Sequence, residues 1–110
     1  MIKVMVMIKR KPGISHEEFC KHYEEVHAPL ALKLLPTIKK YVRNYVVILP
    51  GMEEPGFDCI TEFWYDDMEG TQASIDTLNS DAGKVIQDDE ATFMDKDKQV
   101  VLLVDERETK

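Results

Sequence analysis

The sequence lacks any long apolar run, and cysteine, tryptophan and glycine are all scarce in it. Its 110 residues include two cysteines, one tryptophan and five glycines. No apolar stretch approaches the ~18 residues that a membrane-spanning helix needs. The first residues are apolar before they turn basic, whereas a secretory signal peptide has the opposite order. We therefore expect a protein that is neither exported nor embedded in a membrane.

The few cysteines and the missing motifs exclude further classes of protein. Cys20 and Cys59 have no close spacing, which suits reduced thiols in the cytosol better than a disulfide framework. The sequence contains no glycine-rich phosphate loop, no serine nucleophile elbow and no cysteine-rich metal motif. We therefore expect a cytoplasmic protein that uses neither a metal nor an organic cofactor.

Positive charge is also in short supply. Lys and Arg number 14 against 21 Asp and Glu, so the formal net charge is −7. Polyanions are repelled, on average, by a protein with this balance of charge. Nucleic acid and anionic membrane surfaces are therefore not expected as partners.

What the sequence does contain is an alternation of strand and helix patterns in one domain, residues 1–110. Period-two alternation and apolar runs predict strands over 2–9, 39–49, 57–65 and 100–104. Helical spacing predicts a helix from Ser15 to Pro36 and two shorter ones over 68–79 and 81–94. The order β-α-β-β-α-β, with the second helix split, predicts an α+β ferredoxin-like fold with a four-stranded antiparallel sheet.

Three of these four strands are apolar on both faces. One layer of helices covers only one face of a sheet, and a sheet with one wet face shows a clean alternation of apolar and polar residues. The second face therefore needs a cover, and a second copy related by two-fold symmetry supplies it most simply. We predict a homodimer packed through the sheet, with Trp64 in its core; the alternative is that these side chains are simply exposed.

His27 is the strongest candidate for a catalytic residue. Phe19, Tyr23, Val26 and His27 recur at helical spacing, which predicts that they share one face of the first helix. Pro29 removes a backbone hydrogen bond, so we expect a kink or break at His27 and a pocket beside it. A partly buried histidine there can take and return a proton near neutral pH. The alternative is a structural histidine that bonds the carbonyl freed by the kink.

Two polar residues of the second strand extend this hypothesis. Tyr41 and Arg43 point to the same side, where a tyrosine hydroxyl could stabilise an oxyanion and an arginine could hold a carboxylate. Tyr23 and Phe63 complete the expected substrate-binding set. The alternatives are a half-buried strand tyrosine and an arginine in a surface ion pair.

The remaining polar groups suggest no metal site. His22 lies about 140° around the helix from His27, since successive residues are ~100° apart. His16 and Cys20 do share a face, but a pair of ligands is weak evidence for zinc, which takes three or four. We interpret both cysteines as small hydrophobic residues, and the acidic run 88–90 as a solvated helix face.

Four segments resemble the EthD-like family of dimeric α/β-barrel proteins: KRKPGISHEEFCKHYEEVHAPLALKL, YVRNYV, TEFWYDD and DDEATFMD. The resemblance implies a ferredoxin-like subunit, a dimer whose sheets form a barrel, and a pocket between sheet and helices in which His27 acts. In similar methylmuconolactone methylisomerases, the residues that match His27 and Tyr41 line the active site. Phe63 stands where those enzymes place a cysteine, so the isomerase reaction itself is not implied.

These features support three hypotheses of function. The first is a cofactor-free acid–base enzyme of isomerase, dehydratase or lyase type that acts on a small cyclic, aromatic or polyketide-like carbonyl compound. The second is a non-catalytic accessory protein of an oxygenase system that binds a small apolar ligand. The third is a cofactor-independent monooxygenase. Haem binding through His27 is a further alternative.

Overall fold

A computed structural model describes all 110 residues and contains one four-stranded antiparallel sheet. The strands are β1 (Ile2–Ile8), β2 (Lys40–Tyr45), β3 (Cys59–Tyr65) and β4 (Val100–Val104). The helices are α1 (His16–His22), the π-helix η1 (Tyr23–His27), α2 (Ala28–Leu34), α3 (Met68–Leu78), α4 (Lys84–Phe93) and the 3-10 turn η2 (Lys96–Lys98). The strand order β2-β3-β1-β4 confirms the predicted ferredoxin-like α+β fold.

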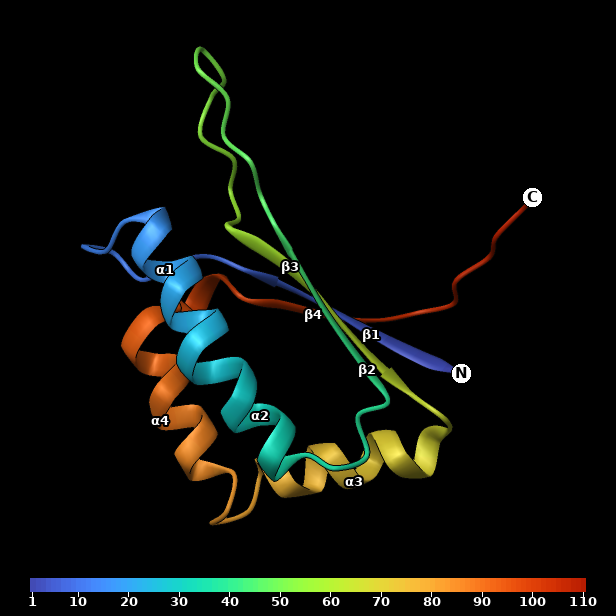
Figure 1. Cartoon of the computed structure of the whole chain (residues 1–110). Coiled ribbons are helices and arrows are strands. Elements are labelled where there is room, and N and C mark those ends of the chain that lie inside the picture. The colour runs from blue at the N-terminus through green and yellow to red at the C-terminus, as the bar shows by residue number, and fades with distance from the viewer.

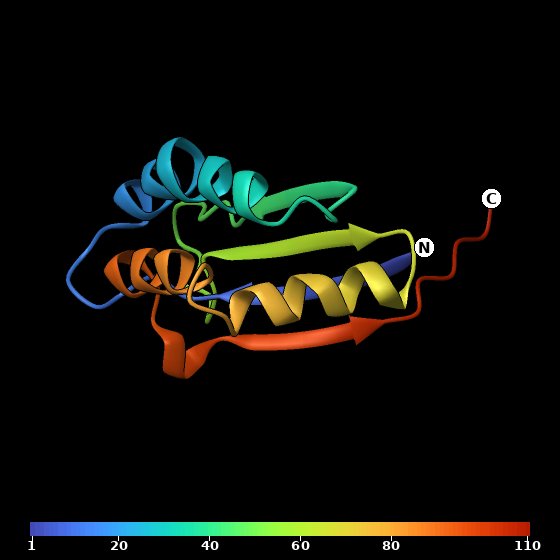
Figure 2. The ribbon, with the colours of Figure 1, turned by 90° about the horizontal axis from the view of Figure 1, so that it is seen from below.

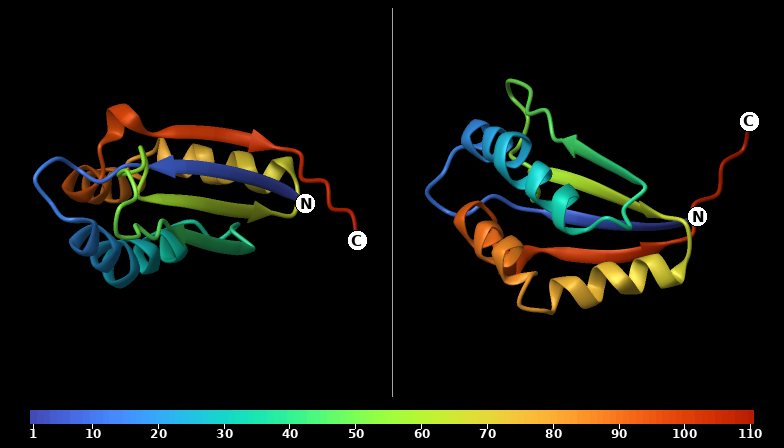
Figure 3. Two further views of the ribbon diagram at one scale, coloured as in Figure 1. Left: turned by 90° about the horizontal axis from the view of Figure 1, so that it is seen from above. Right: turned by 60° about the horizontal axis from the view of Figure 1, so that its bottom comes forward.

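The helices α1, η1, α2, α3 and α4 cover the same face of the sheet (Figure 1). Figure 2 shows the strands in the order given above, with the helices in front of them. The left panel of Figure 3 shows the opposite face, where the strands lie in front and no element covers them. No helix in the fold is both long enough and apolar enough to cross a membrane.

The strand register determines which side chains meet the helices. Tyr41 pairs with Phe63, which pairs with Val4, and Val4 pairs with Leu103 on β4. Because side chains alternate along each strand, this row and its neighbours two residues away point to the helices. The intervening row, which includes Trp64, points to the open face.

The first helix is continuous, but it changes its winding at the predicted kink. Ser15 and Glu18 form the expected capping box at its start. From Tyr23 to His27 the chain forms a π turn, and the backbone N–H of Ala28 bonds the carbonyl of Tyr23. Pro29 has no N–H to donate, so the wider turn accommodates it without a break. The turn also leaves Val26 46% exposed, against the prediction that it shares the buried face.

The main core lies between the sheet and the paired helices α1 and α4. Its buried members come from β1, β3, the first helix and α4 with the residue that follows it: Val6, Ile8, Phe19, Tyr23, Ala28, Cys59, Phe93 and Met94. The ring centroids of Phe19 and Phe93 lie 5.4 Å apart, and those of Tyr23 and Phe93 lie 5.6 Å apart. Aromatic contacts at these distances fix the first helix against α4.

The β2–β3 connection is longer than predicted, because β2 ends at Tyr45 instead of residue 49. Residues 46–58 project beyond the end of the sheet (Figure 1). Val47 and Leu49 within this connection are 72% and 61% exposed. The Val46 amide donates to the Asp58 carbonyl, but no strand pairs with the residues that follow it. The apolar residues over 46–49 therefore do not form a strand.

Candidate functional site

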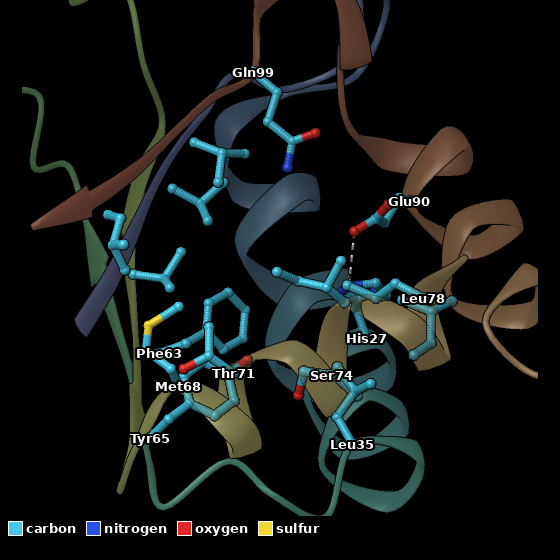
Figure 4. Close-up of a pocket in the computed structure, with 17 residues that line it drawn as sticks. His27, Leu35, Phe63, Tyr65, Met68, Thr71, Ser74, Leu78, Glu90 and Gln99 are labelled. Carbon is cyan, nitrogen blue, oxygen red and sulfur yellow. Dashed lines mark ion pairs between the residues drawn. The ribbon is translucent and has the colours of Figure 1, made fainter. Parts of the chain in front are cut away.

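A cavity of about 280 Å³ lies between the helix-facing side of the sheet and the helices. It is lined by Val4, Val6, His27, Ala31, Leu35, Phe63, Tyr65, Met68, Thr71, Ser74, Ile75, Leu78, Ile86, Glu90, Gln99, Val101 and Leu103. Twelve of these residues are hydrophobic, and the polar ones converge from η1, α3, α4 and the residue before β4 (Figure 4). An apolar cavity with a few polar groups is the usual form of a small-molecule site.

His27 reaches this cavity from the π turn. The residue is only 3% exposed, and its Nδ1 lies 2.8 Å from Oδ2 of Asp89. A carboxylate can only accept, so Nδ1 donates, and the neutral ring leaves Nε2 as an acceptor. Nε2 lies 3.9 Å from Oε2 of Glu90, on the side that faces the cavity (Figure 4). The sequence also allowed a structural His27 that bonds the backbone carbonyl freed by Pro29. In the structure, His27 bonds Asp89 instead.

The environment of His27 keeps its ring neutral at neutral pH. Burial lowers the pKa of His27 below its ordinary value of about 6.5, and the hydrogen bond that His27 donates to Asp89 only partly opposes this shift. A neutral imidazole with a fixed tautomer can accept a proton at Nε2. His27 thus has the geometry and the protonation state of a general base.

Asp89 holds two histidines at once. Its Oδ1 lies 2.9 Å from Nε2 of His22, while its Oδ2 accepts from His27. The three side chains meet because α4 packs along the first helix, with the Phe93 ring 5.1 Å from that of His27. No group of three or more His, Cys, Asp or Glu side chains is arranged to hold a metal ion.

Glu90 and Gln99 are the other polar groups with chemical potential in the cavity. Glu90 also forms an ion pair with Lys96. Gln99, the residue just before β4, points into the cavity (Figure 4). The hydroxyl of Thr71, by contrast, donates to the carbonyl of Asp67, and that of Ser74 lies 3.1 Å from the hydroxyl of Thr37.

Tyr41 and Tyr23 lie on the expected face of their elements but do not line this cavity. The Tyr41 hydroxyl donates to the Tyr23 hydroxyl at 2.8 Å. The Tyr23 hydroxyl in turn lies 2.8 Å from the hydroxyl of Thr61. Burial raises the pKa of both tyrosines well above the ordinary value, so both hydroxyls stay protonated. Tyr23 does touch His27, with its ring edge-on at a centroid distance of 5.5 Å.

Phe63 lines the cavity, whereas Arg43 lies outside it. Arg43 forms an ion pair with Glu24 at 3.1 Å and does not line the cavity. Phe63 does line it and stacks on Tyr41 with ring centroids 4.6 Å apart. Of the five predicted site residues, His27 and Phe63 therefore share the cavity, while Tyr23, Tyr41 and Arg43 lie behind or beside it.

Sequence reasoning missed Asp89 and Glu90, which were expected on a solvated helix face. Only part of the acidic run is exposed, because Asp89 and Glu90 turn towards His27. A signal was present: Ile86, Glu90 and Phe93 recur at i, i+4 and i+7 on the buried side of α4, with Asp89 next to them. This helical period places Asp89 and Glu90 near the buried side of α4 and Asp88 on its exposed side.

The family comparison matches most of the chain. A family model described as the EthD domain matches residues 11–97. No protein with a curated description gives a match.

Solved structures share the fold over nearly the whole length. An ethyl tert-butyl ether D (EthD) family protein from Bacillus halodurans C-125 is 26% identical, with a TM-score of 0.70 over 97% of this chain and 100% of that one. An EthD-like protein from Ralstonia eutropha JMP134 is 22% identical, with a TM-score of 0.64 over 94% and 86%. A protein from Bacteroides fragilis, described as dimeric with a ferredoxin-like fold, is 12% identical, with a TM-score of 0.62 over 94% and 93%.

Proposed function

The chain belongs to the EthD domain family, and from this membership and the cavity around His27 we propose a cofactor-free acid–base enzyme. Its substrate would be a small cyclic, aromatic or polyketide-like carbonyl compound, and its reaction of isomerase, dehydratase or lyase type. The observation that carries the proposal is the hydrogen bond between His27 and Asp89, which leaves Nε2 of His27 facing a mostly apolar cavity.

The proposed step is proton transfer at a carbon next to a carbonyl group. His27 Nε2 accepts the proton from this carbon, and the electron pair of the broken C–H bond moves to the carbonyl oxygen. Asp89 stabilises the imidazolium that forms, because its carboxylate faces Nδ1 at 2.8 Å. The same proton returns from Nε2 to another carbon in an isomerisation, or to a leaving hydroxyl in a dehydration.

The negative charge on the carbonyl oxygen needs a hydrogen-bond donor. Gln99 lines the cavity and can offer its side-chain amide to this oxygen. The oxyanion role predicted for Tyr41 stays a prediction, since its hydroxyl donates to Tyr23 and reaches the substrate only if that bond is exchanged. Glu90, 3.9 Å from Nε2, is placed to relay the proton.

The test is turnover by the purified protein against a panel of small cyclic and aromatic carbonyl compounds. We expect His27→Ala to lower kcat by roughly 100-fold or more, since a general base contributes about 10²–10⁴. Leu32→Ala, which truncates a side chain that is 49% exposed on α2, is the matched control. An unchanged rate for His27→Ala would remove His27 from the mechanism.

A second candidate function is non-catalytic binding of a small apolar ligand for a partner enzyme. The mostly apolar lining of the cavity favours this function, because apolar side chains can bind a small ligand without taking part in a reaction. Native mass spectrometry that finds a co-purified ligand, with no conversion across the panel, would support this function. Oxygen uptake with an oxidisable member of the panel would instead indicate the monooxygenase.

We also propose that the protein is a homodimer that packs through the open face of its sheet. This face presents Met5, Met7, Val42, Ile60, Trp64, Val100 and Leu102. The description of the structurally similar Bacteroides fragilis protein as dimeric supports the proposal. A second copy would remove these side chains from water, which is the main favourable term in association.

A further inference from the structure

A second group of reactive side chains lies outside the cavity, where α1 meets the segment before β3. The Sγ of Cys20 lies 3.5 Å from Nε2 of His16, and Nδ1 of His16 lies 2.7 Å from Oδ1 of Asp58. His16 and Cys20 are one turn apart on α1, while Asp58 comes from 42 residues beyond His16. The proposed function uses none of these three residues.

Asp58 fixes the tautomer of His16. Its side chain is only 3% exposed and accepts from the backbone N–H of Arg10 at 2.8 Å and from Nη1 of Arg10 at 2.7 Å. Burial opposes ionisation, but the hydrogen bonds from Arg10 and His16 prevail and hold the pKa of Asp58 below its ordinary value. The carboxylate therefore accepts from Nδ1, and in the tautomer that carries its proton on Nδ1, Nε2 accepts from the Cys20 thiol.

We propose that Cys20, His16 and Asp58 form a second reactive site, at which the Cys20 sulfur adds to a small α,β-unsaturated carbonyl compound. The arrangement has the three parts of an activated nucleophile: a thiol, a base within reach of its proton and a carboxylate that orients the base. It is independent of the cavity, because His27 and its partners lie on other turns and on α4.

The addition balances without a co-reactant. His16 Nε2 takes the thiol proton while the sulfur forms a bond to the β carbon. The π electron pair of the double bond shifts towards the carbonyl, giving an enolate. The proton then passes from Nε2 to the α carbon, so that a thioether remains and no group leaves. Asp58 stabilises the imidazolium in between.

The state of the thiol explains why the base is needed. Burial, together with the charge of Asp58, raises the pKa of Cys20, so the thiol is protonated at rest and cannot react as a ready-made thiolate. Removal of its proton must therefore accompany the attack, and His16 is the group within reach. Cys59 offers a contrast: it is fully buried, and its pKa is raised to about 11.

N-ethylmaleimide, itself an α,β-unsaturated carbonyl compound, tests the proposal on the folded full-length protein at pH 7. We expect a single adduct by mass spectrometry, located on Cys20 by peptide mapping and absent from Cys20→Ser. His16→Ala should slow this labelling by roughly tenfold or more, since a general base contributes about 10²–10⁴. Added imidazole should restore part of the lost rate in His16→Ala and leave Cys20→Ser unlabelled.

Glu17→Gln is the matched control, because it changes one charge on the same turn and leaves the three residues intact. It should label no more slowly than the wild type. Loss of folding cannot imitate the expected result, because unfolding exposes thiols and accelerates labelling. Labelling of His16→Ala at the wild-type rate, or preferential labelling of Cys59 in the folded protein, would overturn the proposal. Neither result bears on turnover in the cavity, so the two proposals fail separately.

Discussion

At the scale of single residues, the burial of His27 links the proposed chemistry to pH. A side chain that is 3% exposed can hold a charge only at a cost, even with a carboxylate at 2.8 Å. The ring therefore stays neutral where an exposed histidine would begin to protonate. The same effect that makes His27 a base also makes the fold sensitive to acid.

The depressed pKa of His27 predicts that stability falls as the pH falls below about 6.5, the ordinary value for histidine. In this range the unfolded chain binds a proton that the folded state resists, so the contribution of His27 is complete above pH 6.5 and is lost below it. Urea unfolding between pH 8 and pH 5 measures the effect. His27→Gln should flatten this dependence, whereas Leu32→Ala, on the exposed side of α2, should not; equal slopes for all three proteins would contradict the prediction.

Asp89 is predicted to act through His27. Asp89→Asn keeps the shape of the side chain but removes the charge that stabilises the imidazolium, so kcat on an active substrate should fall by roughly tenfold or more with little change in KM. His22→Gln removes the other partner of Asp89 and serves as the control. Turnover of Asp89→Asn at the wild-type rate would reduce Asp89 to a structural role.

At the scale of elements, the first helix sets the position of the site. The capping box fixes where the helix begins, and the π turn at its centre rotates the following residues relative to a plain α-helix. Tyr23 and His27 both face the core as a result, while Val26 turns outward. A substitution at the start of this helix should therefore lower the free energy of unfolding more than it changes the shape of the cavity.

Ser15→Ala tests the contribution of the cap. The Ser15 hydroxyl accepts from the backbone N–H of Glu18 at 3.0 Å, and its loss should cost about 1 kcal/mol in the free energy of unfolding. Lys21→Ala, an exposed change on the same helix, should stay within about 0.5 kcal/mol of the wild type. Chemical denaturation measures the free energy of unfolding of both variants. Equal losses for the two would mean that the capping box does not stabilise the start of the helix.

At the scale of the whole molecule, the two faces of the sheet differ in what covers them. Helices cover one face and leave the other open (Figure 3). The register places apolar side chains of all four strands on the open face. Charged groups are present there too, since Lys3 pairs with Glu62 and lies 4.8 Å from the Trp64 ring centre. Because β1 and β3 are the two central strands, a second copy would have to cover this ion pair together with the apolar side chains around it.

Ile60→Lys is predicted to disrupt the proposed dimer. The substitution puts an ammonium group on a central strand of the open face, where packing against a second copy would leave it buried and unpaired. Sedimentation velocity at micromolar concentration should show a shift from two subunits to one. Leu32→Lys, on the exposed side of α2, should leave the wild-type sedimentation unchanged. A wild-type protein that sediments as a single subunit would refute the dimer itself.

The sequence alone determined the order of the elements and the two-sided apolar character of the strands, because these follow from short-range periodicity. It also singled out His27, since a histidine on an apolar stripe before Pro29 stands out locally. The length of β2 was overestimated, because apolar content over 46–49 resembles a strand whether or not a partner strand is present.

Only the tertiary structure decided which groups join His27. Asp89 is 62 residues away from it in the sequence, and the packing of α4 against the first helix brings the two together. The same packing left Tyr23 and Tyr41 bonded to each other behind the cavity and drew Arg43 to Glu24. A sequence reports which face of its own element a side chain occupies, but contacts between distant elements depend on how those faces pack.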